Sequence, residues 1–565
     1  MFRRVATLLL LSAVLAGPAY AQGTELLPGV TFEQTVQFTP HGPVVLNVIT
    51  APRPGDQNGL YALVPVLGGA TVTGGRERVT QIEKDVSSQA TVAGVNGDFF
   101  SGSNGQPAGI FMRGGLLVRP PLASRSSVGV DAQGVLHVDR VKFFGTWRGT
   151  GQRRTLDGLN QVPTQGQVVL FTPDYGLRVP AVPGSAEVVL QPFPATAPNA
   201  DLTATVSAVG AGGGERIPPG GAIIQATGPA AANLRAEAPA GTSITARLIL
   251  QPAWTGLVSA LGGGPELVRN SAPIFQSLED FTNDQVAARS PRAAVGQLAD
   301  GRIILVAVDG AQPGYSVGLT NFELAQAMAR LGAVTASALG SGNDVTAAFD
   351  GQLLNRPSAG SGGRAVKEAL LVEYFGVYAS EVPFQLLTGE PGSTQQQLSY
   401  KIVRPSLVTA ELIGPDNVPR VLEAGVQHGP GTYAFTYSNF DVEGTWHWNV
   451  TATDDLQRTS TIDRTFRYDA TLRGLVAPNL ARGIAVFGFT LARSAAVTLQ
   501  IETKTGVVVR ELAPVSLPPG AQSVVWDGTL PHGSLAYAGA YVAHLSVTSS
   551  VGTSGFDVPF AFRRS

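Results

Sequence analysis

Short apolar runs separated by glycine- and proline-rich turns dominate residues 36–378, a pattern typical of β-strands. We expect the clearest runs to form strands: PVVLNVIT at 43–50, RIILVAVD at 302–309 and EALLVEYF at 368–375. One helix is well marked, because Thr320 and Glu323 form a capping box and Gly332 provides a C-terminal stop. The apolar residues of this helix recur at helical spacing on one face. A weaker helix is predicted over 78–89.

Changes in pattern along the chain predict five segments. The start combines Arg3 and Arg4, a short apolar run and the small residues Ala19-Tyr20-Ala21, which indicates a signal peptide cut before Gln22. We therefore expect an exported protein, in the periplasm, the cell envelope or the medium, with no transmembrane segment after cleavage. The predicted segments are a signal peptide (1–21), an α+β catalytic-type domain (22–379), a polar linker (380–398) and two all-β Ig-like sandwiches (399–470 and 471–565).

The two predicted sandwiches read as copies of one another. SYKIVRPSLVTAEL at 399–412 resembles GFTLARSAAVTLQI at 488–501, and GTWHWNVTATD at 444–454 resembles GAYVAHLSVTS at 539–549. Each copy alternates apolar and polar residues over about 90 positions, as a β-sandwich does. We expect Trp446, Trp448 and Trp526 to be core aromatics. The second copy, with VVWDG and YAGAYVAHL, resembles the Ig-like domain of flagellar hook-assembly proteins, which suggests a spacer or attachment module.

Composition excludes several kinds of chemistry. The chain has no cysteine, which rules out disulfides, thiol catalysis and cysteine metal sites. Its formal net charge is −2 and it carries no basic run, so nucleic acid is not an expected partner. A formal nucleophile-elbow pattern surrounds Ser316, but a serine hydrolase of that type needs a histidine after the serine. The only histidines in the large domain, His41 and His137, precede it. We expect no cofactor and no metal.

A set of polar residues at predicted turns remains as candidate chemistry. Carboxylates can serve as acid, base or nucleophile at an anomeric carbon, and an arginine fork can hold a phosphate. Residue types alone do not show that these side chains meet, and Asn-Gly and Gly-Asp pairs are also ordinary turn residues. The candidates are Asn96 and Asp98 in VNGDFF, Arg289 and Arg292 in RSPRAAVG, Asp309 in VAVDG, Ser316, Thr320, and Asn343 and Asp344 in LGSGNDV.

Ordered motifs along the large domain resemble the phosphodiester glycosidase family. They include VNGDFF (95–100), LGGGPELVRN (261–270), SPRAAVG (290–296), VDGAQPGYSVGLTNFELAQAM (308–328) and RAVKEALLVEY (364–374), within residues 35–375. The resemblance implies hydrolysis of the glycosidic bond in a sugar-1-phosphodiester, here of an envelope or extracellular glycan. It also implies that Arg292 neutralises the phosphodiester, while Asp98 or Asp309 assists departure of the phosphate or activates water.

The chain departs from the family pattern at two positions. The family's Leu-Asp-Gly-Gly-Gly-Ser-Ser segment is Leu339-Gly340-Ser341-Gly342-Asn343-Asp344-Val345 here, and Ala311 replaces the arginine of its Val-Asp-Gly-Arg segment. Two interpretations stay open. Either Asp344 supplies the carboxylate missing at Gly340, or the site is degenerate and the protein binds glycans or builds the envelope. The first predicts catalytic Asp98, Asp309 and Asp344, with Asn96, Arg289, Arg292, Ser316, Thr320 and Asn343 binding substrate. A third hypothesis makes the protein a surface-layer or envelope assembly component, with the sandwiches as the functional part.

Overall fold

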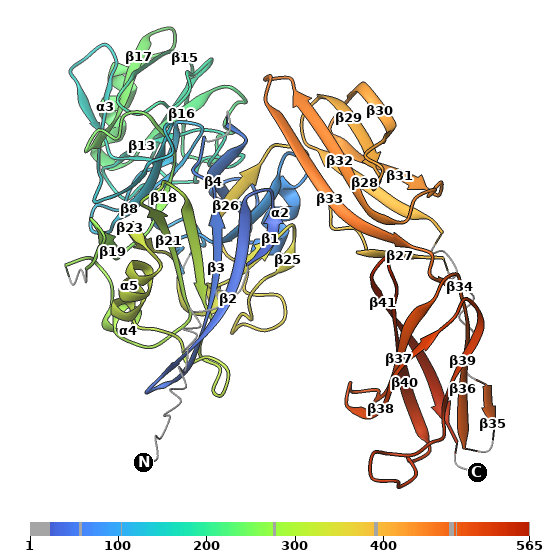
Figure 1. The fold of residues 1–565 in the computed structure, drawn as a ribbon. Helices are drawn as coiled ribbons and strands as arrows, with labels where there is room; N and C mark the ends of the chain where they lie inside the picture. The colour runs from blue at the N-terminus through green and yellow to red at the C-terminus, as the bar shows by residue number, and fades with distance from the viewer. Residues whose placement is uncertain are drawn as a thin grey trace, which may run out of the picture. The chain divides into compact units, whose positions relative to one another are not determined.

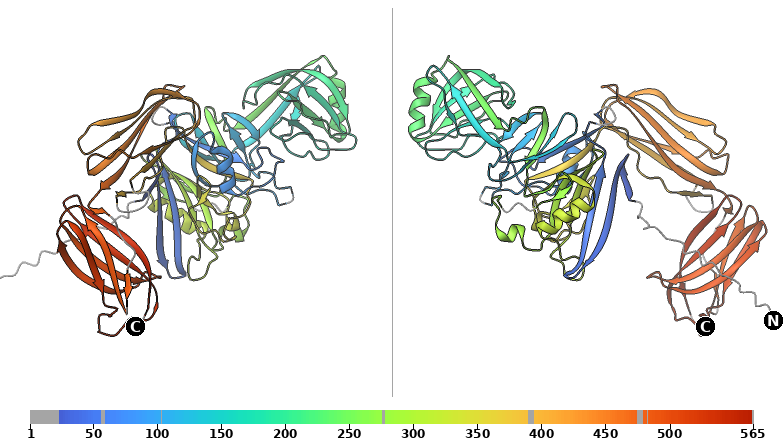
Figure 2. Two further views of the ribbon diagram at one scale, coloured as in Figure 1. Left: turned by 90° about the vertical axis from the view of Figure 1, so that its right-hand side faces the viewer. Right: turned by 60° about the vertical axis from the view of Figure 1, so that its left-hand side comes forward.

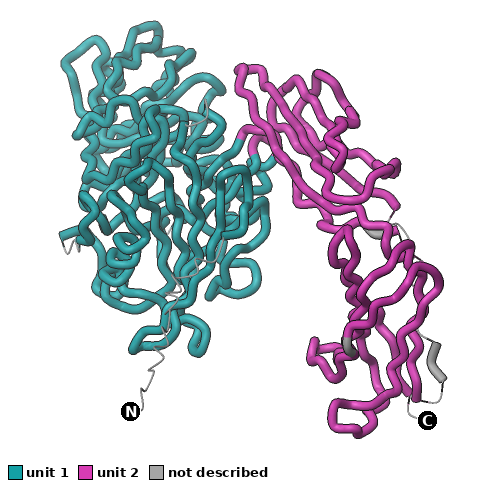
Figure 3. Tube along the Cα trace, viewed as in Figure 1, with its two compact units in different colours: residues 1–87, 91–374 teal, residues 88–90, 375–565 magenta. Residues whose placement is uncertain are grey.

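The structure, a computed structural model, describes residues 23–563 apart from 56–58, 103, 275–277, 389–393, 474–478 and 482. The predicted signal peptide lies outside the described residues. The chain is mostly β, with 51% of residues in strands and 7% in helices, so helix contributes less than the α+β prediction implies. It divides into two compact units, residues 1–87 with 91–374 and residues 88–90 with 375–565 (Figure 3). No helix in the described part is long and apolar enough to span a membrane.

An antiparallel eight-stranded sheet forms one layer of the first unit (Figure 1). Its middle strands contain the predicted runs 43–50 and 302–309, confirming both as strands, and they are buried along most of their length. The order is β1 (Thr24–Leu27), β2 (Val30–Thr39), β3 (Gly42–Ala51), β22 (Ile303–Val308), β21 (Arg292–Leu298), β23 (Ala333–Ala338), β19 (Glu266–Arg269) and β20 (Ala272–Pro273).

Helix α5 (Asn321–Arg330) packs on β19 and β23 of this sheet, and its start follows the predicted capping box. The Thr320 hydroxyl accepts the N–H of Glu323, and the Glu323 carboxylate accepts the N–H of Thr320. These bonds satisfy two backbone donors that a helix start leaves free. Gly332 has φ +91°, as a left-handed stop requires. Helix α2 (Val79–Val86) confirms the weaker prediction over 78–89.

A five-stranded sheet carries the candidate site at one end of its central strands. Strand β5 (Thr91–Asn96) is buried throughout and lies between β24 (Ala347–Phe349) and β26 (Glu368–Tyr374), both antiparallel to it. The segment after β5 therefore meets the residues that lead into β24 and β26. The outer strands are β25 (Gln352–Leu353) and β4 (Tyr61–Leu67), and α2 packs on β5 and β24.

Two further sheets and the remaining short helices complete the first unit (Figure 2). A large apolar cluster around fully buried Trp147 holds much of this region together. One sheet has the order β7 (Leu116–Arg119), β6 (Phe111–Arg113), β18 (Leu257–Gly262), β8 (Ser127–Asp131), β9 (Leu136–Asp139). The other has the order β11 (Arg154–Leu156), β10 (Lys142–Arg148), β17 (Ser243–Gln251), β15 (Asp201–Ala211), β14 (Ala186–Leu190), β16 (Ala222–Ala226), β13 (Val168–Phe171), β12 (Gly158–Leu159). The helices are α3 (Gly228–Glu237), α4 (Asn283–Val286) and the 3₁₀ turn η1 (Gly342–Asp344).

The second unit repeats one strand arrangement, as the sequence repeat predicts. The pairs β28–β31, β29–β30, β29–β32 and β32–β33 of the first copy correspond to β36–β39, β37–β38, β37–β40 and β40–β41 of the second. The first copy comprises β28 (Gln396–Ile402), β29 (Ser406–Ile413), β30 (Pro419–His428), β31 (Gly431–Tyr437), β32 (Gly444–Asp454) and β33 (Thr459–Asp469). The second comprises β34 (Leu472–Arg473), β35 (Asn479–Ala481), β36 (Ile484–Leu491), β37 (Ala495–Thr503), β38 (Val508–Leu517), β39 (Gly520–Trp526), β40 (Gly539–Thr548) and β41 (Thr553–Phe562).

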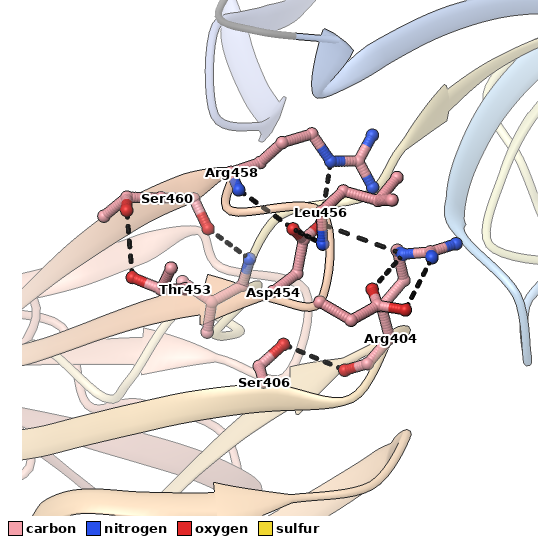
Figure 4. A network of polar contacts seen from close by, with 10 residues as sticks. Arg404, Ser406, Thr453, Asp454, Leu456, Arg458 and Ser460 are labelled. Carbon is pink, nitrogen blue, oxygen red and sulfur yellow. Dashed lines mark hydrogen bonds and ion pairs between the residues drawn. The ribbon is translucent and has the colours of Figure 1, made fainter.

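Each copy has its own apolar core and its own ordered turns. Trp446, Trp448 and Trp526 are fully buried, as expected of core aromatics. The turn between β32 and β33 is organised by Asp454, whose carboxylate accepts the backbone N–H groups of Leu456 and Arg458 and the Nε–H of Arg458 (Figure 4). These contacts involve only residues of the second unit, and they give Asp454 a structural role.

Part of the predicted linker 380–398 belongs to the first sandwich. Strand β27 (Gln385–Leu387) pairs in parallel with β33, and Leu386 is buried in the core. Strand β28 begins at Gln396, before the predicted boundary at 399. A three-residue edge strand within a turn-rich stretch leaves no periodicity to detect, which is why the sequence indicates only a linker there. Residues 389–393 of the segment lie outside the described residues.

Candidate active site

Asn96 ends β5 and ties three segments together. Its Nδ2 donates to the carbonyl of Gly340 (3.0 Å), and its Oδ1 accepts the N–H of Thr346 (3.2 Å). The N–H of Gly340 in turn donates to the carbonyl of Gly97 (2.9 Å). The predicted loops 95–100 and 339–345 are therefore in direct contact. Asn96 is 1% exposed, and its amide holds the backbone of the site.

Gly340 leaves no empty space where the family pattern has an aspartate. A Cβ added at this position would lie 2.9 Å from the carbonyl oxygen of Gly97 and 3.0 Å from Nδ2 of Asn96. Contacts this short force neighbouring atoms to move. Backbone fills the space that a side chain would need, so the position of the missing carboxylate is closed in this chain.

Asp98 is buried and its carboxyl group is only partly engaged. The residue is 3% exposed, and its Oδ1 has no hydrogen-bond partner within the described ranges. The other oxygen, Oδ2, faces two glycines: a Cβ on Gly262 would lie 2.1 Å from it, and a Cβ on Gly109 3.1 Å. Burial raises the pKa of Asp98 to about 7, a shift that the Phe99 backbone hydrogen bond and then the nearby Arg125 charge partly offset. This carboxyl group can therefore exchange a proton near neutral pH.

Glu368, the first residue of β26, is the carboxyl partner of Asp98. Its Oε1 accepts the backbone N–H of Asp98 at 3.1 Å, and its Oε2 has no partner among the residues described. Burial raises the pKa of Glu368 well above its usual range, and the Asp98 charge raises it further. Sequence reasoning missed this residue because EALLVEYF was assigned only as a strand. The available signal was a carboxylate beginning an otherwise apolar, buried strand.

Three further polar side chains beside the carboxyl pair were not predicted. Arg119 donates through Nη1 to Oε1 of Gln106 (3.2 Å) and to the carbonyl of Asn160 (3.1 Å). Burial lowers the pKa of Arg119 and raises that of Tyr175, whose hydroxyl also interacts with Gln106. The positive charge of Arg119 opposes the rise in the pKa of Glu368. The sequence indicated Arg119, Gln106 and Tyr175 only weakly, because each lies singly in a loop or at a strand end.

The two phenylalanines of VNGDFF support arginine side chains. The guanidinium of Arg125 lies 5.6 Å from the ring centre of Phe99 and 4.3 Å from that of Phe281. Two other guanidiniums, those of Arg76 and Arg364, lie 5.1 Å and 5.2 Å from the ring centre of Phe100. These distances are typical of cation–π contacts. The segment after Asp98 is thus lined with positive charge.

Asp344 lies in η1 and is paired. Its Oδ1 accepts a hydrogen bond from Nη1 of Arg364 at 2.9 Å, and the residue is 6% exposed. Burial raises the pKa of Asp344, while Arg364 and then Arg76 act to lower it. The neighbouring Asn343 is exposed and accepts the hydroxyl of Ser358.

Asp309 is a structural hub. Its carboxylate accepts hydrogen bonds from Asn355 (2.8 Å), Tyr315 (3.0 Å), Asn47 (3.1 Å) and the N–H of Arg356 (3.3 Å). Both oxygens are therefore occupied, which differs from the expected role in phosphate departure or water activation. Burial raises the pKa of Asp309, and the hydrogen bonds oppose that rise.

Ser316 is likewise committed to the fold. Its hydroxyl donates to the carbonyl of Asp309 (2.5 Å) and accepts the N–H of Val45 (3.0 Å), and the residue is fully buried. This geometry agrees with rejecting Ser316 as a nucleophile. It does not give the hydroxyl the substrate contact that we expected.

Arg292 and Arg289, which were predicted to bind substrate, instead form hydrogen bonds within the protein. The guanidinium of Arg292 donates to the carbonyls of Leu319 (2.9 Å), Ala288 (2.6 Å) and Gln285. Arg289 pairs with Glu323, the capping-box residue of Thr320. These residues therefore anchor the start of α5 and the segment before β21. Burial lowers the pKa of Arg292 to about 10, which is still high enough to keep it charged.

The predicted set thus separates into three groups, one of which is Asp309 with Ser316, whose hydroxyl donates to the Asp309 carbonyl. Asn96, Asp98 and the 340–344 segment meet at the end of β5, together with the unpredicted Glu368. Arg289, Arg292 and Thr320 form the third group at the start of α5. Over the residues described, no group of three or more histidine or acidic side chains is arranged to hold a metal ion.

Comparison with protein families matches two parts of the chain. Residues 197–373 match the phosphodiester glycosidase family, and residues 479–550 match the FlgD Ig-like domain. The first match includes Arg292, Asp309, Asp344 and Glu368 but begins after Asp98, so it covers less than the resemblance over 35–375. No curated protein matches the chain.

Solved structures match part of the chain. A hypothetical protein from Synechocystis is 24% identical with a TM-score of 0.51, and the match covers 61% of this chain and 62% of that one. A protein from Burkholderia pseudomallei is 24% identical with a TM-score of 0.47, covering 59% and 74%. The zebrafish N-acetylglucosamine-1-phosphodiester α-N-acetylglucosaminidase catalytic domain is 15% identical with a TM-score of 0.33, covering 63% and 85%. The Synechocystis match supports the fold alone.

The family matches agree with the order of motifs and modules in the sequence. The chain carries a domain of the phosphodiester glycosidase family, matched over residues 197–373, followed by a FlgD Ig-like domain at 479–550.

Proposed function

We propose that the first unit hydrolyses the glycosidic bond of a sugar-1-phosphodiester, with Asp98 and Glu368 as its carboxyl pair. The observation that carries the proposal is their geometry: two buried carboxyl groups joined through the Asp98 N–H, each with one oxygen that lacks a partner among the described residues. Buried polar atoms are normally hydrogen-bonded, and exceptions concentrate where a group serves a reaction or a ligand. The family match to residues 197–373 supports the reaction type.

The chemistry requires one proton exchange and one bond cleavage. Water adds its oxygen to the anomeric carbon, the bond from that carbon to the phosphate oxygen breaks, and the electron pair leaves with the phosphate. The products are the free sugar and a phosphomonoester, and water supplies both the new hydroxyl and the proton. A carboxyl group with a pKa near 7, as burial gives Asp98, suits general acid or base work at neutral pH. Burial raises the pKa of Glu368 well above its usual range, and a protonated carboxyl group can donate a hydrogen bond.

The surrounding charge suits an anionic substrate. Arg125 acts on Asp98 and Arg119 acts on Glu368 through their charges. In a site with little water such charges interact more strongly than at the surface. They would stabilise the negative charge that develops on the departing phosphate.

Turnover and its loss in isosteric variants test this proposal. The full chain is incubated with a panel of sugar-1-phosphodiesters, and release of free sugar is measured. We expect Asp98→Asn and Glu368→Gln to lower kcat at least about a hundredfold. The matched control is Glu373→Gln, a buried carboxyl group on the same strand whose pKa is also raised by burial. It should leave kcat within about twofold. Equal loss in all three variants, with the fold intact, would remove the assignment.

A second candidate function is glycan binding without catalysis. The favouring observation is that Asp98 and Glu368 are 3% and 0% exposed, while backbone closes the aspartate position at Gly340. This function predicts that the folded chain binds envelope polysaccharide and turns over none of the diesters. Sedimentation with the polysaccharide, run beside the turnover assay, distinguishes the two.

We further propose that the protein is exported and that its sandwiches attach it to the cell envelope. The signal-peptide pattern of residues 1–21 and the FlgD Ig-like match support this proposal. Cell fractionation tests it: the mature chain should begin at Gln22 and co-sediment with envelope. Recovery of uncut chain in the cytosol would contradict it.

A further inference from the structure

Two exposed arginines share one aromatic ring beside the carboxyl pair. Arg76 lies in the loop before α2, and Arg364 lies just before β26. Both guanidinium carbons lie near the ring of Phe100, at 5.1 Å and 5.2 Å from its centre. Phe100 follows Asp98 by two residues, so their Cα atoms are within about 7 Å. The arginines therefore contact the ring of a residue two positions after Asp98.

Main-chain hydrogen bonds join the two segments that carry the arginines. Glu77 and Val366 pair in both directions, with N–H to carbonyl distances of 3.0 Å and 2.8 Å. This antiparallel bridge holds the segment that contains Arg76 against the segment that contains Arg364. Gly105 lies along the Arg76 side chain, where an added Cβ would be 3.9 Å from Nε.

Asp344 fixes the orientation of the Arg364 guanidinium and accepts from only one of its N–H groups in the described structure. It accepts from Nη1 of Arg364 at 2.9 Å, while 46% of the Arg364 side chain is exposed. Arg76 is exposed as well. A guanidinium stacked on a ring presents its N–H edge outward, and a fork of this kind matches phosphate oxygens. Two arginines with one carboxylate leave a net positive charge.

We infer that Arg76 and Arg364 form a clamp for the phosphate of the substrate, with Asp344 as the positioning residue for Arg364. The inference rests on the proposed glycosidase function for the identity of the substrate. It replaces Arg292 as the phosphate-holding residue, because the Arg292 guanidinium is bonded to three backbone carbonyls. It also replaces a catalytic role for Asp344. The sugar would then lie towards Asp98 and the phosphate towards Phe100.

Anion binding by the full chain tests the clamp independently of turnover. Inorganic phosphate is titrated calorimetrically at constant ionic strength, with acetate as the carboxylate probe. We expect Arg76→Ala and Arg364→Ala to weaken phosphate binding about tenfold or more. The control, Arg78→Ala, removes a nearby exposed arginine that packs on Gly362, and should change affinity less than twofold. Arg364→Lys keeps the positive charge beside Asp344 but removes the planar guanidinium, so it tests whether phosphate binding needs the fork of N–H donors.

The outcomes separate the clamp from the proposed function. Unchanged phosphate affinity in both alanine variants, or acetate binding as tight as phosphate, would overturn the clamp whether or not the wild type turns over a diester. If the wild type binds phosphate but hydrolyses none of the panel, and both alanine variants lose phosphate affinity, the clamp is upheld and the glycosidase function is contradicted.

Asp344→Asn tests the positioning role. It should raise KM for a hydrolysed diester severalfold while kcat and its pH profile stay within about twofold of wild type. A hundredfold fall in kcat would make Asp344 catalytic and refute positioning.

Discussion

At the scale of single residues, the same side-chain types serve opposite purposes in this protein. Asp309 and Asp98 are both buried aspartates after a strand, yet the first accepts four hydrogen bonds and the second has an oxygen without a partner in the described structure. A buried carboxyl group whose oxygens both accept hydrogen bonds has its bonding capacity used by the fold. A buried, under-bonded carboxyl group is costly to ionise and retains capacity for a proton or a ligand.

The raised pKa of Asp98 predicts how stability depends on pH. Its pKa rises from 3.8 unfolded to about 7 folded, so the folded state binds more protons between these values. The unfolding free energy therefore falls as pH rises through this window. Asp98→Asn removes this titration. As the pH rises from 4 to 8, the unfolding free energy of the variant should therefore increase relative to that of the wild type, by up to about 4 kcal/mol. Urea denaturation at both pH values measures the change.

The control for this measurement is Asp300→Asn. Hydrogen bonds from Arg302 lower the pKa of this exposed carboxylate. The pH dependence of stability therefore has the opposite sign for Asp300. The stabilisation that its carboxylate contributes is present at pH 8 and is lost as the pH falls through its lowered pKa. If the unfolding free energies of the wild type and the Asp98→Asn variant changed in parallel with pH, the assigned burial of Asp98 would be contradicted.

Arg292 should matter for stability more than for substrate binding. Replacing it with alanine leaves three backbone carbonyls without their donor, which should lower the unfolding free energy by about 3 kcal/mol or more. Arg292→Lys should rescue little, because one ammonium group cannot reproduce the planar fork. Chemical denaturation tests this. A stable Arg292→Ala protein with a greatly raised KM would instead restore its phosphate-binding role.

At the scale of elements, the end of β5 shows how a turn becomes a site. Strand β5 lies between β24 and β26, so the residues that follow it contact the segments before both neighbours. Small residues are what let these segments approach: Gly340 packs on Gly97, and Gly262 at the end of β18 packs on the Asp98 carboxyl group. Turn chemistry and site chemistry here use the same residues.

Gly262→Ala is therefore a test of the site's packing. The new Cβ would lie 2.1 Å from Oδ2 of Asp98, so the carboxyl group must move. We expect a loss of about 1–3 kcal/mol in unfolding free energy, together with a fall in any diester turnover. Gly75→Ala is the control, since a Cβ there meets no atom within 4 Å. Equal stability of the two variants would show that the Asp98 side chain does not occupy this position.

At the scale of the whole molecule, two units divide the work proposed for the chain. All residues of the carboxyl pair and the clamp belong to the first unit, and the repeated sandwiches belong to the second. Each unit has its own buried core. The units should therefore unfold separately.

Truncation after Phe375 tests this independence. The shortened chain should fold, keep its kcat for any hydrolysed diester within about twofold and lose envelope attachment. Tryptophan fluorescence follows the two units, because Trp147 and Trp254 lie in the first and Trp446, Trp448 and Trp526 in the second. A single cooperative transition of the full chain, or an insoluble truncated chain, would show that the units depend on each other.

The sequence alone determined features that depend on neighbouring residues. The capping box of α5, the strands at 43–50, 302–309 and 368–375, and the repeated sandwich all follow from patterns spanning a few residues or one module. Hydrophobic periodicity and helix capping act over such distances, so they can be seen in one dimension. The order of motifs likewise indicated the family that the comparison matched.

Only the tertiary structure decided which polar residues form the candidate site. Asp98 meets Glu368 across 270 positions, and Asn96 meets Gly340 across 244. Whether an arginine is free to bind phosphate depends on which carbonyls surround it, and those of Arg292 come from three separate residues that only folding brings together. Burial, which sets the pKa of Asp98, is also a property of packed segments and not of sequence spacing. The residues of VNGDFF were recognisable from the sequence, but their partners were not.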